Sequence, residues 1–314
     1  MIDILLAYYN RPSELMRAIS SVQRQSYENW RLLVLDDESD TDMSASVGLL
    51  HDERIVYYRI PHQGTLAKVR NYSSRWINAE WVAFLDDDDW WHTDKLRVQM
   101  DWLSRNPTVG ILASEACEET VGMEGKLDDE LASKLRVRWV DSKDLAWANC
   151  VYHPSVIMKR VFFEELGGYD IHLDNWEDWD LWIRYTDRYG SIPVIDASLL
   201  HYTINPNGVT RSGVSDVRKV WERINYMYNK MEQGSFLYKK TILSKMNYFC
   251  SITDKSTKRR FLKALESVTM TPNQPGPWAA LLLFWMPFKW TWALRIFIQN
   301  LRFVDVGNAS KRKR

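Results

Sequence analysis

The stretch Trp81-Val82-Ala83-Phe84-Leu85-Asp86-Asp87-Asp88-Asp89-Trp90-Trp91 decides the fold. Its first five residues are apolar, and an apolar run this short predicts a buried strand rather than a core helix. The apolar positions of residues 95–103 recur at helical spacing, so the four carboxylates lie in a turn between a strand and a helix. In open α/β sheets, ligands bind outside the carboxyl ends of the strands. This turn is therefore the first candidate site.

Four adjacent carboxylates repel one another, so their proximity requires an explanation. Neighbouring carboxylates raise one another's pKa unless a cation neutralises them. Oxygen ligands of this kind suit Mg²⁺ or Mn²⁺ better than Zn²⁺. A plainer interpretation is that Asp88 or Asp89 caps the following helix while the other carboxylates are solvated. That interpretation explains one or two acids, but not four.

Strands and helices alternate before the acidic turn. Buried strands are predicted at residues 2–8, 30–35 and 54–60, and helices after Pro12, near 41–51 and at 66–77. This alternation over about ninety residues predicts a parallel, doubly wound α/β sheet. Right-handed crossovers would bring Tyr9, Asp37 and the acidic turn to one edge of the sheet.

No glycine-rich phosphate loop accompanies these strands. The motif GxGxxG does not follow the first strand, and GxxxxGK[ST] does not occur in the sequence. The usual dinucleotide and P-loop sites are therefore unsupported. The later pattern predicts strands at 109–113, 156–158 and 192–204, a helix at 161–166 and an acidic loop at 118–130.

A second group of acids lies in the stretch Asn175-Trp176-Glu177-Asp178-Trp179-Asp180-Leu181-Trp182-Ile183-Arg184. Acids in the first turn of a helix interact favourably with its dipole, and this interaction alone could explain why they occur here. Tryptophan also recurs at every third position beside these acids, which predicts an apolar wall. Such a wall raises the pKa of a carboxylate toward the range of a general base.

The composition is that of an ordinary globular protein. The 314 residues are 46% hydrophobic and 26% charged, and 41 basic residues balance 41 acidic ones, so no global field attracts nucleic acid. The odd number of cysteines, 3, implies neither a disulfide framework nor a zinc site and fits a cytoplasmic environment. The apolar N-terminal strand has no basic region before it and does not resemble a signal peptide.

The C-terminal third is predicted to be helical, with a break at the proline-rich segment 271–277. The apolar run 278–288 is too short for the roughly 20 residues that span a bilayer. Polar and apolar residues separate across 278–304, which predicts an element at the membrane interface. A helix docked on the catalytic domain or on a second subunit is an equal alternative. We therefore expect three regions, 1–210, 211–270 and 271–314.

Over roughly residues 2–210 the chain resembles the inverting GT-A glycosyltransferases of family 2. The opening AYYNRPSELMRAISSVQRQSYENWRLLVLDDESD is similar to the family's first strand, Asn-Arg turn, helix and V-D-D-x-S segment. LAKVRN matches its A-x-x-R-N helix, FLDDDDWWHTDKL its F-L-D-x-D-D segment and NWEDWDLWIR its E-D motif. The resemblance implies a GT-A fold, which is a Rossmann-like, mostly parallel sheet with flanking helices, here followed by a helical extension.

The resemblance also implies roles for individual side chains around a nucleotide-sugar donor. The implied nucleotide contacts are Tyr9, Arg11, Asp37, Arg70, Asp86 and Asp87.

The remaining implied roles concern the metal and the acceptor. Asp88, together with Asp86, would hold the Mn²⁺ or Mg²⁺ that bridges the donor's diphosphate. Asp178 would be the catalytic base, and Glu177 would position the acceptor.

Some positions depart from the family pattern. Where the family has Pro-Thr in its first turn, this chain has Ala7-Tyr8. A histidine that many relatives carry in a late loop corresponds to Asn205, with His201 four residues earlier, so a third metal ligand stays open. Arg211 in the same loop could fold over the donor phosphates.

The sequence as a whole predicts a metal-dependent, inverting glycosyltransferase that uses a nucleotide-diphospho sugar, with UDP or dTDP favoured. The predicted acceptor is a hydroxyl of a glycan or of a lipid-linked saccharide in the synthesis of a bacterial surface polysaccharide. The predicted location is cytoplasmic and peripheral to the inner face of the cell membrane. Two alternatives stay open: a nucleotidyltransferase, and a non-catalytic scaffold or binding subunit that retains the fold.

Overall fold

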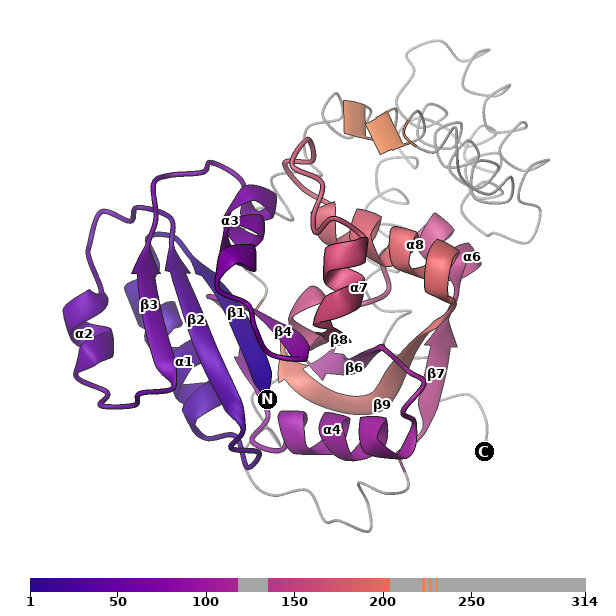
Figure 1. Ribbon diagram of the computed structural model, residues 1–314, viewed down its shortest axis with the longest axis horizontal. Coiled ribbons are helices and arrows are strands. Elements are labelled where there is room, and N and C mark those ends of the chain that lie inside the picture. Colours follow the sequence, from indigo (N-terminus) through magenta and orange to yellow (C-terminus); the bar gives the residue numbers. More distant parts are fainter. Residues whose placement is uncertain (118–134, 204–221, 224–225, 228–229, 231–314) are drawn as a thin grey trace, which may run out of the picture. The chain divides into compact units, whose positions relative to one another are not determined.

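The computed structural model describes residues 1–117, 135–203, 222–223, 226–227 and 230 (Figure 1). The first of two compact units carries the sheet and contains every described residue up to 203 except 146–150. The expected acidic loop, the interfacial segment 278–304 and most of the helical extension lie outside the described residues. The expected boundaries of the three regions stay a prediction. None of the described helices is long and apolar enough to cross a bilayer.

Four strands form the parallel half of a nine-stranded sheet, in the order β3-β2-β1-β4. All seven residues of the central strand β1 are buried. Parallel strands that are covered on both faces are apolar throughout, which explains the continuous apolar runs in the sequence. The bounds are β1 Ile2–Tyr8, β2 Trp30–Asp36, β3 Ile55–Arg59 and β4 Trp81–Asp86.

The helices of this half cover opposite faces of the sheet (Figure 1). Helix α1 has Pro12 at its first position, which the first turn tolerates. Its apolar face is fully buried, as the spacing of Leu15, Ala18, Ile19 and Val22 predicts. The helical segments are α1 Pro12–Gln23, α2 Ser44–Gly48, α3 Leu66–Tyr72, the 3₁₀ turn η1 Ser73–Arg75 and α4 Lys95–Arg105.

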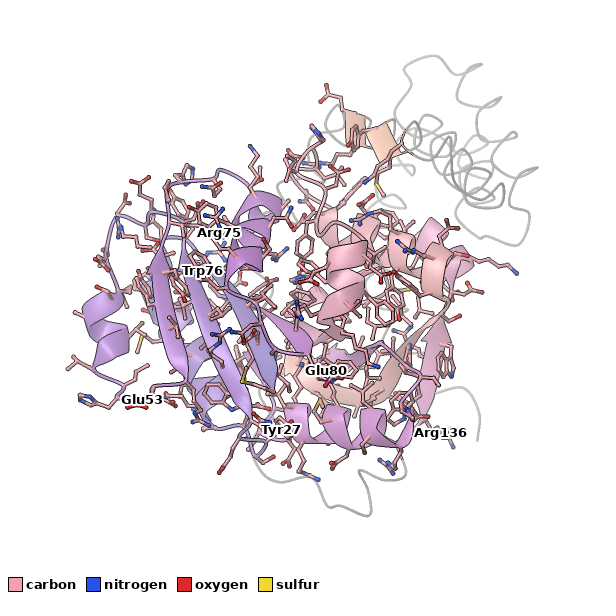
Figure 2. All side chains as sticks on the ribbon, in the orientation of Figure 1. Tyr27, Glu53, Arg75, Trp76, Glu80 and Arg136 are labelled. Carbon is pink, nitrogen blue, oxygen red and sulfur yellow. The ribbon has the colours of Figure 1, made fainter. Side chains whose placement is uncertain are left out.

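Two apolar cores lie on the two faces of β1. Residues two apart on a strand share a face, so Ile2 and Leu6 pack in the larger core with Trp30. Ala7 faces the smaller core with Val69 of α3. That smaller core is closed at the outer strand, where Trp76 stacks on Tyr58 of β3 with ring centroids 3.9 Å apart and Arg75 beside it (Figure 2).

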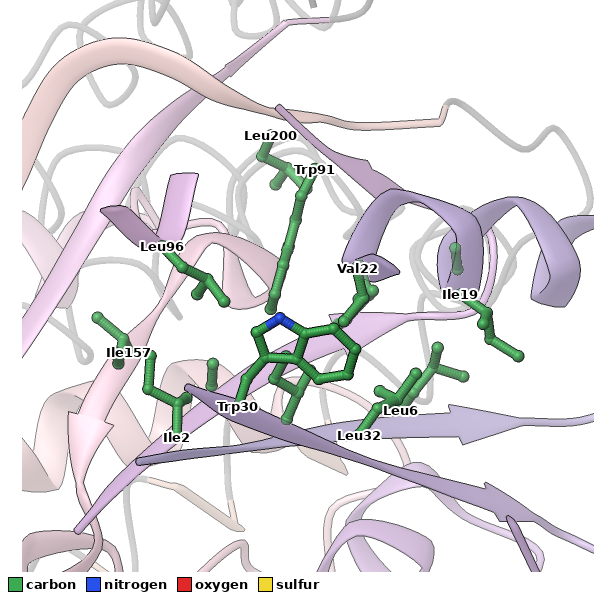
Figure 3. Packing of buried hydrophobic residues seen from close by; sticks show 14 of the residues in the cluster. Ile2, Leu6, Ile19, Val22, Trp30, Leu32, Trp91, Leu96, Ile157 and Leu200 are labelled. Carbon is green, nitrogen blue, oxygen red and sulfur yellow. The ribbon is translucent and has the colours of Figure 1, made fainter. Parts of the chain in front are cut away.

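The larger core continues into the second half of the sheet. Trp30 of β2 lies near Val22 of α1, while Trp91 and Leu200 come from segments far apart in the sequence (Figure 3). All four side chains are buried. This shared core joins the parallel strands to the strands that follow.

The second half of the sheet is mixed. β8 pairs antiparallel with β4 and with β6, whereas β9 pairs parallel with β6 and antiparallel with β5 and β7. The expected α/β architecture is confirmed, but beyond β4 the sheet is mixed rather than mostly parallel. The strands are β5 Trp90–Trp91, β6 Ile111–Cys117, β7 Val137–Val140, β8 Ile157–Lys159 and β9 Ile192–His201. The helical segments are α6 Ser142–Trp147, η2 His153–Ser155, α7 Arg160–Glu165 and α8 Glu177–Tyr189.

Gly110 precedes β6 and has no room for a side chain. A Cβ there would lie 1.8 Å from Cε2 of Phe162 on α7. We expect Gly110→Ala to lower the free energy of unfolding by about 1–3 kcal/mol, since overpacking forces neighbours to shift. Gly48→Ala is the matched control, because no atom lies within 4 Å of its Cβ position. Urea unfolding measures both, and an equal effect of the two substitutions would contradict the packing argument.

Lys95, at the start of α4, is a fully buried amine. Its Nζ donates to Gln99 Oε1 at 2.8 Å and lies 3.9 Å from the centroid of the Trp91 ring. Burial lowers the pKa of the Lys95 amine well below its usual value. Over the pH range between the folded and unfolded pKa values, the amine is neutral in the folded protein and protonated in the unfolded chain.

The buried amine should make stability depend on pH. Between the lowered folded pKa and the unfolded value of about 10.4, the unfolded chain binds the extra proton, so the free energy of unfolding rises with pH. This contribution is complete above the unfolded pKa and is lost as the pH falls to the folded pKa. We expect wild type to gain stability relative to Lys95→Met between pH 7 and pH 10 in urea unfolding. Exposed Lys68→Met should show no such trend, and a pH-independent difference for Lys95→Met would contradict the prediction.

Candidate active site

The carboxyl ends of β1, β2 and β4 share one edge of the sheet, because β1 pairs in parallel with both neighbours. Just beyond the strands, the Tyr9 amide donates to Asp87 Oδ2 at 3.3 Å. The Asp37 amide donates to the Tyr8 carbonyl at 3.0 Å. The predicted convergence of Tyr9, Asp37 and the acidic turn is therefore confirmed.

Asp37 presents a fixed carboxylate beside an exposed aromatic ring. The Gln63 amide donates to Asp37 Oδ1 at 2.6 Å, and His62 Nδ1 lies 3.0 Å from Oδ2. Burial raises the pKa of Asp37, while these neighbours oppose the rise. The ring of Tyr9 is 47% exposed and lies 5.2 Å from that of His62. This corner can accept a hydrogen bond from a planar ligand and stack against it.

Arg11 holds two carboxylates of the acidic turn. Its Nη1 lies 2.9 Å from Asp87 Oδ1 and 2.7 Å from Asp88 Oδ2. Burial raises the pKa of Asp87 to about 7, although Arg11 opposes the rise. Asp88 keeps 18% of its side chain exposed. Arg11 thus supplies the positive charge that the crowded acids need.

Asp86 faces a different arginine. Arg70 Nη2 lies 2.6 Å from Asp86 Oδ1, and His153 Nδ1 lies 3.6 Å from the same oxygen. Burial alone would raise the pKa of Asp86, but the Arg70 guanidinium and His153 hold it well below its usual range. Asp86 is therefore ionised, and Arg70 is 96% buried beside it rather than open to a ligand (4% exposed).

The last acid of the turn is anchored by the end of β9. Asp89 is buried, and the Thr203 amide donates to its Oδ1 at 2.8 Å. His201 is also buried, and its ring stacks on Trp90 with centroids 3.4 Å apart. The acidic turn is thereby fixed to the end of β9, through the bond from Thr203 and through the pairing of β5 with β9. The predicted positions Asn205 and Arg211 lie outside the described residues.

The site also includes the start of α8, in addition to the strand ends. Trp176, the residue before the helix, has a positive φ of 70°. Glu177 is buried, and its Oε1 lies 2.5 Å from Arg70 Nη1. Asp178 is half-buried, and its Oδ1 accepts the Trp179 amide at 2.7 Å. Burial raises the pKa of Glu177, Arg70 opposes the rise, and Asp178 adds to it. Contact of Glu177 with an acceptor stays a prediction.

Two residues of the site, the buried His153 and the half-buried Asn71, were not singled out by the sequence analysis. His153 Nε2 lies 2.8 Å from the Tyr169 hydroxyl, and burial lowers the pKa of the histidine. Asn71, next to Arg70, bonds the backbone of Tyr169 in both directions. His153 belongs to no motif. Asn71 belongs to the A-x-x-R-N segment, which was the available signal.

The acids of the site are candidate ligands for a divalent cation. Within the described part of the chain, no three or more His, Cys, Asp or Glu side chains are grouped as metal ligands. Mg²⁺ in nucleotide sites is commonly held by one or two carboxylates plus substrate phosphates and water. The partly exposed Asp88 carboxylate fits that smaller ligand set, although Arg11 engages its Oδ2, and Arg70 likewise engages Oδ1 of Asp86.

Solved structures share the fold. S. aureus TarS 1–349 in complex with UDP-GlcNAc matches with a TM-score of 0.61 and 14% identity, covering 86% of this chain and 81% of that one. The mannosyltransferase PcManGT from Pyrobaculum calidifontis, in complex with GDP-Man and Mn²⁺, matches with a TM-score of 0.58 and 17% identity, covering 90% and 78%. At these identities the similarity shows the fold alone.

Curated relatives match over about a third of the chain. The UDP-Glc:alpha-D-GlcNAc-diphosphoundecaprenol beta-1,3-glucosyltransferase WfgD of Escherichia coli is 33% identical over 106 residues, which is 34% of this chain and 42% of WfgD. The putative colanic acid biosynthesis glycosyl transferase WcaA of the same species is 34% identical over 100 residues, 31% of this chain and 36% of WcaA. The match thus spans less than half of either relative. The sequence model of Glycosyl transferase family 2 matches residues 3–163, just over half of the chain, and the chain belongs to that family.

Proposed function

We propose that the protein is a metal-dependent, inverting glycosyltransferase that uses a nucleotide-diphospho-sugar donor, with UDP or dTDP favoured. One observation carries the proposal: the acidic turn 86–89 and Asp37 meet at one sheet edge, and Arg70 links that turn to the helix that bears Asp178. The donor's base would lie against Tyr9 and Asp37. Its ribose and diphosphate would lie toward Asp86, Asp87 and Arg11.

Asp178 would act as the base in a single displacement. The acceptor hydroxyl gives its proton to the Asp178 carboxylate while its oxygen attacks the anomeric carbon of the donor sugar. The bond from that carbon to the diphosphate breaks, and the electron pair leaves with the nucleoside diphosphate. One attack from the opposite face inverts the configuration and needs no covalent intermediate.

Asp88 would hold the divalent cation, Mn²⁺ or Mg²⁺, with Asp86 as the second residue of the predicted metal pair. A bound cation stabilises negative charge on a leaving diphosphate. Arg11 contacts Asp88 in the structure, and its five donors also suit phosphate oxygens. We propose that Arg11 turns from the carboxylates to the donor when cation and donor bind.

The predicted acceptor is a hydroxyl of a glycan or a lipid-linked saccharide. The name of WfgD, which includes a UDP-glucose donor and a diphosphoundecaprenol-linked sugar, supports this class, as does the role in colanic acid biosynthesis in the name of WcaA. A lipid-linked acceptor would require a cytoplasmic enzyme that works at the inner face of the cell membrane. Peripheral contact through 278–304 is part of this proposal, and that segment lies outside the described residues.

The reaction products separate this proposal from its two alternatives. A glycosyltransferase releases a nucleoside diphosphate from a nucleotide sugar. A nucleotidyltransferase releases pyrophosphate from a nucleoside triphosphate, and a non-catalytic scaffold releases neither. Incubation with UDP-, dTDP-, GDP- and CDP-sugars and with the four triphosphates, followed by assay of both products, tests all three functions. Pyrophosphate release, or no release with any donor in the presence of acceptor and Mn²⁺, would overturn the proposal.

Asp88→Ala is expected to remove the metal dependence of nucleotide binding. Thermal unfolding with UDP, dTDP, GDP and CDP, each with and without Mn²⁺, should show a stabilisation of wild type that needs the metal. Ligand-induced stabilisation follows the ratio of ligand concentration to Kd, so the variant should lose the metal-dependent part of the shift. Glu53→Ala, which removes an exposed acid away from these side chains, is the control. An unchanged Mn²⁺-dependent shift in Asp88→Ala would remove this residue from the metal site.

A further inference from the structure

Helix α3 contacts the segment that leads into α8 through two adjacent side chains. Arg70 and Asn71 lie at the end of α3, and both reach residues about one hundred positions later in the sequence. The sequence resemblance assigns Arg70 to the nucleotide. The contacts below point to a different role for this pair.

Arg70 is a buried bridge between two carboxylates. Its Nη2 lies 2.6 Å from Asp86 Oδ1, and its Nη1 lies 2.5 Å from Glu177 Oε1. The guanidinium lies 5.5 Å from the centroid of the Tyr169 ring. Only 4% of Arg70 is exposed. The planar fork of an arginine can bond two carboxylates at once, whereas a lysine ammonium is a point charge. Arg70 therefore connects the end of β4 to the first residue of α8.

Asn71 fixes the backbone of the same segment. Its Nδ2 donates to the Tyr169 carbonyl at 2.7 Å, and its Oδ1 accepts the Tyr169 amide at 2.9 Å. This close approach requires a glycine at the preceding position, because a Cβ on Gly168 would lie 2.6 Å from Asn71 Oδ1. Gly168 also has a positive φ of 69°. The Asn71 side chain thus satisfies the N–H and the C=O of Tyr169, as a neighbouring strand would, although Tyr169 belongs to no strand.

The helix itself braces the other end of this stretch. Arg184 of α8 donates to the carbonyls of Leu166 at 2.6 Å and Gly168 at 2.8 Å. Its Nε lies 2.7 Å from Asp180 Oδ2, one turn earlier in the helix. The stretch from Leu166 to Tyr169 is therefore held from two sides, and the chain leads from it to α8, whose first turn contains Asp178.

We infer that Arg70 and Asn71 are positioning residues for Asp178. The inference rests on the proposed function, in which Asp178 is the base. Arg70 holds the neighbouring Glu177 against Asp86, and Asn71 holds the chain that enters the helix. Together they set the distance between the donor edge of the sheet and the base. Arg70 acts through these carboxylates and does not contact the nucleotide.

Steady-state kinetics separates positioning from nucleotide binding. We expect Arg70→Lys to lower kcat about a hundredfold, since a 1 Å displacement of a catalytic group costs about that much, with the donor KM within about threefold of wild type. Asn71→Ala, which removes both bonds to Tyr169, and Asn71→Asp, which removes the bond donated to the Tyr169 carbonyl, should also lower kcat. Lys68→Ala, an exposed side chain on the same helix, should leave both constants unchanged. A raised donor KM with unchanged kcat in Arg70→Lys would overturn the inference, because it would make Arg70 a nucleotide contact.

Hydrogen exchange gives a second result that does not depend on activity. In wild type the Asp180 amide donates to the Trp176 carbonyl at 2.9 Å. Arg70→Lys and Asn71→Asp should speed exchange in peptides covering 169–180, while peptides from β1 and β2 keep their wild-type protection. Unchanged exchange in 169–180 for both variants would overturn the inference. If wild type transferred no sugar, the proposed function would fail, and the exchange result would still decide whether this pair positions the helix.

Discussion

Asp178→Asn is expected to abolish sugar transfer while nucleotide binding persists. An asparagine has nearly the same shape but cannot take the proton of the acceptor hydroxyl. Loss of a general base typically costs a factor of about 10²–10⁴ in rate. Asp178 lies in the first turn of α8, opposite the strand ends where the donor is proposed to bind. The measurement is the rate of nucleoside diphosphate release at saturating donor and acceptor, together with thermal unfolding in the presence of nucleotide and Mn²⁺.

A control on the same helix distinguishes a chemical effect from loss of negative charge near α8. Asp187 is exposed two turns further along, so Asp187→Asn should transfer sugar at the wild-type rate. If Asp178→Asn also transfers at that rate, Asp178 is not the base. Loss of the nucleotide-induced thermal shift in Asp178→Asn would also contradict the prediction, because it would make the residue a donor contact.

Asp3→Ala is expected to lower the free energy of unfolding by about 3–5 kcal/mol, the usual effect of removing one partner from a buried ion pair. Asp3 is fully buried at the start of β1, and its Oδ1 accepts from Arg31 Nε at 2.9 Å. Its Oδ2 accepts the amides of Asn78 at 2.7 Å and Ala79 at 2.9 Å. In the alanine variant the buried Ala79 amide would lose its acceptor, and Arg31, whose side chain is 24% exposed, would keep only the Trp76 carbonyl and Asn78. Urea unfolding measures the change.

Two further variants test this account of Asp3. Asp3→Asn keeps an acceptor oxygen but removes the charge, so its cost should be intermediate. Glu53→Ala removes a carboxylate on the surface (Figure 2) and should change the free energy of unfolding by less than about 0.5 kcal/mol. Equal costs for Asp3→Ala and Glu53→Ala would show that the Asp3 contacts contribute little to stability.

The parallel half of the sheet could be predicted because its strands are covered on both faces. A strand buried on both faces is a continuous apolar run, so the predicted runs 2–8 and 30–35 match β1 and β2 to within one residue. The predicted helix at 41–51 is shorter, with α2 covering only Ser44–Gly48. His51, just after it, has a positive φ of 50°, which a helix cannot continue through.

The mixed half could not be predicted from periodicity. β5 has only two residues, Trp90 and Trp91, which is too short for any alternation to be visible. β7 has only four residues and is held by pairing with β9. Both strands exist because β9 passes beside them, and the direction in which a late strand returns to the sheet is not encoded in its own side chains.

The sequence predicted which residues belong to the site better than it predicted which of them form ion pairs with one another. The sequence indicated Asp86 and Glu177 as acids of two separate motifs, and the family motif included Arg70. It contained no signal that one arginine lies between those acids, because ion pairing across the fold depends on how the helices dock. His153 belongs to no motif, yet it is buried with its Nδ1 3.6 Å from Asp86 Oδ1.

The pairing of β9 also has a consequence for the order in which the nascent chain can fold. β1 to β4 are complete once residue 86 has left the ribosome, and this half can pair at once. β6 can first pair with β8 through Ile111 and Leu112, but its remaining residues, β5 and β7 must wait for β9, which begins at Ile192. Until Thr203 emerges, Asp89 lacks the amide that caps it in the folded protein. The acidic turn is therefore translated early but is fully formed only late. Slow translation before residue 192 would prolong the time during which the unpaired part of β6 is exposed to chaperones and to other nascent chains.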